Sequence, residues 1–196
     1  MIVDALSKFC IRHGIITSEE LPVFRYCIEK RFYSAVVFLP LLLLGTIWTN
    51  FATTFAFLCA FTYLRSTTNG LHAKKPLFCF ICSLLIEYLL FKYAIPLLTK
   101  TNVIITLFMS ALAVFLLAPY NHPNMNLTQE EIVACRSASR IRLVQLFLVL
   151  LILSFFSWRD IVIGPFLGIA LASVLLILAY IINWEEFKCL TKEKSS

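Results

Sequence analysis

Charged residues are scarce in this chain, and their scarcity sets its class. Only 14% of the 196 residues are Asp, Glu, Lys or Arg, and the mean hydropathy is +0.87. Soluble domains carry about a quarter of their residues as charged side chains. The composition therefore excludes an ordinary soluble domain and predicts a membrane protein.

Several kinds of site are also missing. Aspartate occurs at Asp4 and Asp160 alone, which excludes aspartate-rich metal sites. The chain has no His-Glu-x-x-His motif, no Gly-x-Ser-x-Gly elbow and no phosphate-binding glycine-rich loop. We therefore expect neither a metal nor another cofactor. The net charge of +6 is better explained by membrane topology than by nucleic-acid binding.

Long polar segments, repeats and a cleavable leader are lacking as well. Five glycines and scattered prolines exclude collagenous or flexible low-complexity organisation. An early acid and the absence of an apolar run before about residue 32 argue against a cleaved signal peptide. Seven cysteines, an odd number dispersed through apolar runs, do not suggest a disulfide framework.

Long apolar runs are what the chain has in abundance. A helix needs about 20 apolar residues to cross the hydrocarbon. Six runs come near that length: Phe32–Thr49, Asn50–Leu64, Leu77–Leu98, Val103–Ala118, Leu143–Trp158 and Ile161–Asn183. The first two are separated by a turn around Trp48 to Asn50 and should form a tight helical hairpin. The predicted fold is an all-α membrane protein of about six transmembrane helices.

The basic residues predict the orientation of these helices. Fourteen of them fall on one side: Lys8, Arg12, Arg25, Lys30, Arg31, Arg65, Lys74, Lys75, Arg136, Arg140, Arg142, Lys188, Lys192 and Lys194. Lys100 and Arg159 fall on the other side, and Lys92 lies near the end of the third span. Because cytoplasmic loops carry the excess of Lys and Arg, both termini and the loop before Leu77 should be cytoplasmic.

The N-terminal residues 1–31 are predicted to form interfacial helices. Ile2, Val3, Leu6, Phe9 and Cys10 share one helical face, which suits a helix lying on the inner leaflet. A second helix should begin near Pro22. Both helices could equally serve only to anchor or pack. We divide the chain into residues 1–31, a transmembrane domain of residues 32–184 and a cytoplasmic tail of residues 185–196.

One hydrophilic stretch, RSTTNGLHAKKPLFC, joins the second and third spans and holds a His and a Cys. In an unbroken helix, residues seven apart lie about 10 Å apart along the axis. Gly70 and Pro76 favour a turn that folds His72 back over the start of the third span. Cys79 would then lie in the first turn, where the helix dipole, Lys74 and Lys75 favour a thiolate. A neighbouring imidazole would complete an activated nucleophile and its base.

At these residues the sequence resembles the accessory gene regulator protein B (AgrB) family of Gram-positive quorum-sensing systems. The shared pattern is Arg65, Gly70-Leu71-His72-Ala73, Cys79 seven residues after the His, and Ser83 one turn later. The similarity extends over almost the whole chain, including Ala118-Pro119 at the end of the fourth span. Where many members carry Asn-Lys-Pro in the following loop, this chain has Asn124-Met125-Asn126-Leu127.

The resemblance implies a plasma-membrane cysteine endopeptidase that matures an autoinducing-peptide precursor, with its active site facing the cytoplasm. It implies Cys79 as nucleophile, His72 as general base, a homodimer, and an AgrD-like peptide as substrate. Cleavage through a Cys thioester would let the peptide cyclise to a thiolactone or lactone. The expected partners are therefore the peptide, the bilayer and a second copy of the chain, and no nucleic acid is expected.

Further residues are candidates for supporting roles. Glu29 and Ser83 could orient the base or stabilise an oxyanion, although Glu29 could equally be a surface charge paired with Arg25. Arg65, Gly70, Lys74 and Lys75 form the predicted substrate-binding set, and simple snorkelling is the alternative for Arg65.

A non-proteolytic function is the competing interpretation. A small membrane transporter or peptide exporter would use Glu87 and Lys92 as polar pathway residues, whereas a structural pairing of Glu87 with Lys92 or another helix is equally tenable. A non-catalytic membrane scaffold would leave the His72 and Cys79 spacing as coincidence. Thiol alkylation distinguishes these classes, because an enzyme should label fastest at Cys79 and lose activity with it.

Overall fold

The computed structural model describes residues 9–12, 17, 21–68, 76–121, 128–155 and 159–193. For some residues within these ranges it describes the backbone but not the side chain: 22–23, 26–27, 29–34, 76, 159–160 and 183–193. The chain divides into two compact units, Met1–Leu43 and Leu44–Ser196. The candidate site lies in the second unit.

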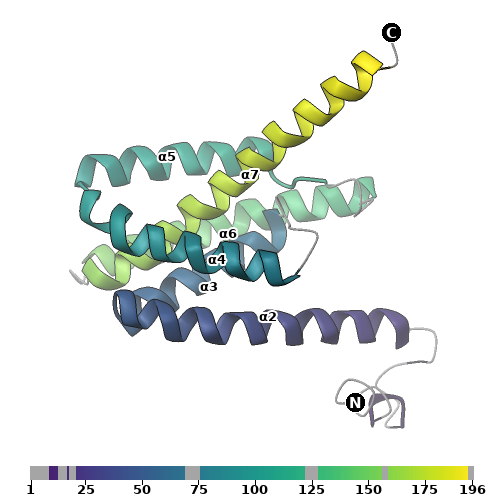
Figure 1. The fold of residues 1–196 in the computed structure, drawn as a ribbon, viewed down its shortest axis with the longest axis horizontal. Helices are drawn as coiled ribbons and strands as arrows, with labels where there is room; N and C mark the ends of the chain where they lie inside the picture. Colours follow the sequence, from purple (N-terminus) through teal and green to yellow (C-terminus); the bar gives the residue numbers. More distant parts are fainter. Residues whose placement is uncertain are drawn as a thin grey trace. The chain divides into compact units, whose positions relative to one another are not determined.

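Every regular element in the described ranges is helical, which confirms the predicted all-α class (Figure 1). The elements are α2 (Leu21–Trp48), α3 (Phe51–Thr68), α4 (Pro76–Leu89), the π-helical η1 (Leu90–Ala94), the 3-10 helix η2 (Ile95–Leu97), α5 (Lys100–Leu117), α6 (Gln129–Phe155) and α7 (Arg159–Glu193).

Four helical segments are long and apolar enough to cross a membrane. They are Leu77–Leu97, Lys100–Leu117, Gln129–Phe155 and Ile161–Ile182, and a shorter apolar helix covers Ala35–Trp48. The chain is therefore a multi-pass membrane protein. Helix α3 is not among the four, because threonines and Arg65 lower its hydropathy.

The first unit holds a short helical segment at residues 9–12 and α2 up to Leu43. Cys10 is buried there, whereas Phe9, predicted on the same apolar face, is exposed. Ile2, Val3 and Leu6, which complete that face, lie outside the described residues. Helix α2 begins at Leu21, one residue before the predicted start at Pro22.

The turn between α2 and α3 is as short as the sequence predicts. Helix α2 ends at Trp48 and α3 begins at Phe51. The side-chain oxygen of Asn50 accepts a hydrogen bond from the Thr53 N–H at 2.8 Å, which satisfies one of the free donors at the start of α3. Local capping chemistry thus positions the hairpin.

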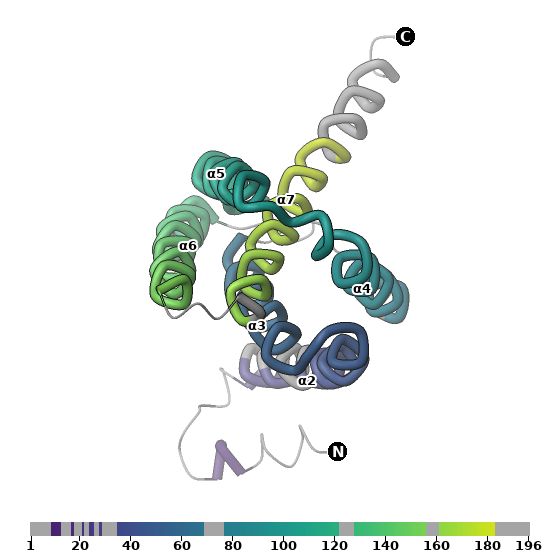
Figure 2. Tube along the Cα trace, turned by 90° about the vertical axis from the view of Figure 1, so that its left-hand side faces the viewer, coloured from purple at the N-terminus to yellow at the C-terminus, as the bar shows by residue number. Residues whose placement is uncertain are grey.

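The core of the second unit is the contact between α3 and α7. Helix α7 also contacts α5 and α6, so it lies at the centre of this unit (Figure 2). A Cβ added at Gly168 would come within 2.8 Å of the Phe57 carbonyl oxygen and of the Phe61 nitrogen. At Gly164 it would collide with the Thr53 carbonyl oxygen. Two glycines four residues apart therefore let the two backbones approach, as in small-xxx-small packing of membrane helices.

Buried polar side chains of α3 and α7 find hydrogen-bond partners within their own helices. Thr54 donates to the Asn50 carbonyl at 2.9 Å, and Thr68 donates to the Leu64 carbonyl at 3.2 Å. On α7, Ser173 donates to the Ile169 carbonyl at 2.8 Å. Because each hydroxyl bonds to its own helix, burial leaves none of the three unsatisfied. The low hydropathy of α3 thus reflects contact with protein.

The third predicted span is not one uniform α-helix. Its α-helical part ends at Leu89, and the backbone continues as η1 and η2 to Leu97. Pro96 lies in η2 and has no N–H to donate to an α-helical ladder. The sequence predicted one apolar span over Leu77–Leu98, and the change of helix type at its end was not part of that prediction.

Two further helices are longer than the predicted spans. Helix α6 begins at Gln129, fourteen residues before the start of the predicted span at Leu143. Its first turns therefore occupy the predicted loop. The reason is a capping box: Glu131 accepts from the Thr128 N–H at 2.8 Å, and Thr128 accepts from the Glu131 N–H at 3.3 Å. Helix α7 continues to Glu193, into the predicted tail.

Candidate active site

Cys79 lies in the first turn of α4, the position that the sequence predicts. Pro76 is the first residue of the helix, which suits its fixed φ and its missing N–H. The Cys79 side chain is half-buried and carries a free thiol. The thiol therefore lies at the start of a helix, as the proposed nucleophile requires.

Arg65, from the last turn of α3, lies within electrostatic range of Cys79. It follows the predicted second span by one residue. The ends of α3 and α4 therefore bring two residues fourteen positions apart within range of an electrostatic interaction. A guanidinium near a thiol can stabilise the thiolate and, during attack on a carbonyl, a developing oxyanion.

Ser83 lies one turn beyond Cys79, and its hydroxyl donates to the Cys79 carbonyl oxygen at 2.9 Å. In this arrangement the proton is directed at the backbone of the turn that carries the thiol. The geometry suits an orienting contact better than donation to an oxyanion.

The remaining predicted site residues lie outside the described part of the chain. His72, Gly70, Lys74 and Lys75 belong to the segment between α3 and α4, and the side chain of Glu29 within α2 is likewise not described. Their predicted roles stay predictions.

The end of α3 that carries Arg65 is fixed to α6 by polar contacts. The guanidinium of Arg142 donates to the Tyr63 carbonyl oxygen at 2.8 Å and to the Ser66 hydroxyl, and it lies 4.7 Å from the centre of the Tyr63 ring. The Tyr63 hydroxyl in turn donates to Gln145 Oε1 at 2.6 Å. The sequence predicts only that Arg142 lies on the cytoplasmic side, because a partner so distant in sequence leaves no local signal.

A second cluster joins the C-terminal ends of α3 and α5 to Tyr180 of α7. The Tyr120 N–H donates to the Thr68 carbonyl oxygen at 3.0 Å, and the Tyr120 and Tyr180 rings meet edge to face with centroids 5.2 Å apart. The Tyr180 hydroxyl donates to the Leu117 carbonyl oxygen at 2.8 Å. The C-terminal end of α3, the C-terminal end of α5 and Tyr180 of α7 therefore lie at one end of the second unit.

Glu87 lies two turns beyond Cys79 on α4 and is 1% exposed. Both of its carboxyl oxygens lack a hydrogen-bond partner among the described residues, and Lys92 is exposed. The predicted pairing with Lys92 is therefore not seen. A Cβ added at Gly45 would come within 2.5 Å of Glu87 Oε1 and of Thr54 Cγ2. Gly45 thus provides the space that the carboxyl group occupies.

Metal-ligating side chains do not gather anywhere in the described residues: no three of His, Cys, Asp and Glu lie together there. The described site offers a thiol at a helix start with a guanidinium within electrostatic range.

Comparison with known proteins identifies a family. The model of the family described as accessory gene regulator B matches residues 2–188. No curated protein and no solved structure matches the chain. Because the match covers nearly the full sequence, including the segment from Arg65 to Ser83, the chain belongs to the accessory gene regulator B family.

Proposed function

We propose that this protein is a membrane-embedded cysteine endopeptidase that cleaves the precursor of an autoinducing peptide. Membership of the AgrB family implies the processing of such a precursor. The observation that carries the proposal of a peptidase is the position of Cys79, in the first turn of an apolar helix and within electrostatic range of Arg65. His72, seven residues earlier, is the proposed general base.

The reaction begins when His72 takes the thiol proton and the Cys79 sulfur attacks the scissile carbonyl. The tetrahedral intermediate collapses to a thioester on Cys79, and the amine of the C-terminal fragment leaves with the proton from His72. A thiol or hydroxyl within the bound peptide then attacks the thioester. The ring closes as a thiolactone or lactone, and the Cys79 thiol is regenerated.

Cyclisation is favoured over hydrolysis for two reasons. The internal nucleophile is held beside the thioester, so its effective concentration far exceeds that of an intermolecular competitor. The apolar residues around Cys79 on α4 limit the access of water.

Some supporting residues act on the peptide, and others act on the catalytic pair of His72 and Cys79. Arg65, Gly70, Lys74 and Lys75 bind the precursor, with the basic side chains directed at its acidic C-terminal part. Glu29 orients His72, and Ser83 fixes the turn that carries Cys79 through its bond to the backbone. The enzyme works as a homodimer.

The site faces the cytoplasm of a Gram-positive cell, with both termini on that side. This topology requires α3 to cross the membrane. Its 18 residues span about 27 Å, close to the hydrocarbon thickness. Four of its threonines, Thr53, Thr54, Thr67 and Thr68, are buried, which supports a crossing despite the low hydropathy.

Point variants assayed with the precursor in proteoliposomes test the dyad. Cys79→Ala and His72→Ala should each abolish cleavage while membrane insertion is unchanged. The loss of cleavage rate in the double variant should not equal the sum of the two single losses, because paired catalytic groups act as a unit. The matched controls are Cys82→Ala, one turn along α4, and Cys135→Ala on α6; both should retain most activity. Full cleavage by Cys79→Ala would refute the peptidase mechanism.

A further inference from the structure

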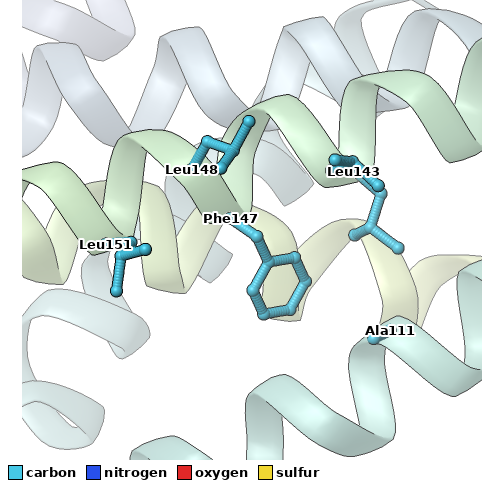
Figure 3. A pocket seen from close by; sticks show the side chains of 6 residues that line it. Ala111, Leu143, Phe147, Leu148 and Leu151 are labelled. Carbon is cyan, nitrogen blue, oxygen red and sulfur yellow. The ribbon is translucent and has the colours of Figure 1, made fainter.

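An open apolar groove with a volume of about 420 Å³ lies between α5 and α6 (Figure 3). It is lined by Ala111, Leu143, Val144, Phe147, Leu148 and Leu151. Leu143 and Leu151 are eight residues apart, so the groove follows α6 for about 12 Å. Its size falls in the range of ligand pockets, and its lining offers no hydrogen-bonding side chain.

A fixed cation lies at one end of this groove. Arg140 is three residues before Leu143 on α6, and Phe115 is four residues after Ala111 on α5. The Arg140 guanidinium lies 4.0 Å from the centre of the Phe115 ring, and its NH2 donates to the Phe115 carbonyl oxygen at 3.2 Å. The ring and the carbonyl therefore hold the charge where the groove ends.

No anion in the described residues neutralises this cation. Arg140 makes one hydrogen bond there, and its buried Nε has no partner. A guanidinium has five N–H donors in a planar fork that matches a phosphate. The acidic residues at the start of α6, Glu130 and Glu131, are exposed, and Glu131 is engaged in the capping box. Among the described residues the guanidinium therefore has donors left for an oxyanion from outside the chain.

Along α6 the charge of Arg140 comes first and the apolar groove follows, as the headgroup and the hydrocarbon follow one another in a bilayer leaflet. Arg140 lies just before the apolar part of α6, and the groove runs along that part from Leu143. In the proposed topology this places Arg140 toward the headgroups and the groove toward the hydrocarbon. A phospholipid joins a phosphate to an acyl chain in that same order. A second copy of the chain is the alternative occupant, and the experiment below distinguishes the two.

We propose that the α5–α6 groove binds an anionic phospholipid, with an acyl chain along Leu143 to Leu151 and the phosphate on Arg140. Basic pockets between transmembrane helices on the cytoplasmic side are typical binding places for anionic headgroups. The site is separate from the proposed catalytic residues and does not depend on the proposed peptidase function.

Native mass spectrometry tests the proposal on detergent-solubilised protein with equimolar dioleoyl phosphatidylglycerol and dioleoyl phosphatidylcholine. The wild type should retain phosphatidylglycerol preferentially, and raising the salt concentration should weaken that preference. Arg140→Gln should lower phosphatidylglycerol binding about fivefold, the effect of one basic residue at a membrane surface. Arg136→Gln, which removes an exposed charge one turn earlier on α6, should leave it unchanged.

A second variant tests the groove without removing a charge. Ala111→Phe fills the space between α5 and α6 and should weaken the binding of both lipids. Equal retention of the two lipids by the wild type would overturn the proposal whether or not Arg140→Gln folds. Loss of a dimer in Ala111→Phe with unchanged lipid binding would also overturn it, because the groove would then belong to a second copy.

Discussion

At the scale of single residues, Glu87 is the group that needs most explanation. A carboxylate with no partner is expensive to bury, whereas the neutral acid loses much less on transfer from water. Both Glu87 oxygens lack hydrogen-bond partners among the described residues, so we infer that the neutral acid is the form that packs against Gly45 and Thr54.

Glu87→Gln should therefore fold as well as the wild type, because the amide has the shape of the neutral acid. Glu87→Lys should fold poorly, because the ammonium group would lie in the same apolar site. The measurement is the yield of monodisperse protein after detergent extraction and heating. Lys92→Gln is the control, since Lys92 is exposed five residues along the helix. A Gln variant as defective as the Lys variant would show that the fold requires a charged carboxylate.

The sequence predicted those features of the site that depend on neighbouring residues alone. Pro76 predicted the start of α4 and hence the helical position of Cys79. The electrostatic interaction of Cys79 with Arg65 could not be predicted, because it depends on how the ends of α3 and α4 meet in space. The proximity of His72 to Cys79 stays a prediction.

At the scale of helices, the close contact of α3 with α7 organises the second unit. Without a hydrophobic driving force between helices in lipid, close backbone packing is a main source of association. Gly168 lies where an added Cβ would meet the α3 backbone rather than a movable side chain. The helices must therefore separate if Gly168 is enlarged.

Gly168→Leu should destabilise the protein strongly, and Gly168→Ala by about 1–3 kcal/mol, the usual cost of overpacking. The apparent midpoint of thermal unfolding in detergent measures both. Val174→Leu is the control, because Val174 is an exposed apolar position on the same helix. If Gly168→Leu melts like the control, α3 and α7 do not pack as described.

Helix boundaries carry signals that apolar length alone does not capture. The capping box from Thr128 to Glu131 was readable in the sequence, and it marks the start of α6 well before the apolar run at Leu143. Pro96 similarly marked the change from α4 to η1 and η2. The Gly164 and Gly168 spacing was also present in the sequence, but nothing local identifies α3 as its partner.

At the scale of the whole molecule, the separation of basic residues predicts one orientation in the membrane. The structure brings the C-terminal ends of α3 and α5 to the same end of the second unit through Tyr120 and Thr68. That arrangement agrees with an even number of crossings between them, but the side of the membrane rests on the positive-inside rule.

Single cysteines introduced into a background without the seven native ones test this orientation. Thr101→Cys, at the exposed start of α5, should react with an impermeant thiol reagent added to intact cells. Asn121→Cys, exposed after α5 at the end that holds Thr68, should react only after the cells are opened. The reverse pattern would place the candidate site outside the cell.

The central claim is that Cys79 becomes acylated by the precursor and then releases a ring. Mass spectrometry of the wild type incubated with its precursor should detect a product one water lighter than the linear N-terminal fragment. With a precursor whose internal nucleophile is replaced by Ala, a hydroxylamine-sensitive adduct should accumulate on Cys79, because no group can displace the thioester. Accumulation of linear acid alone, with no adduct on Cys79, would contradict the mechanism.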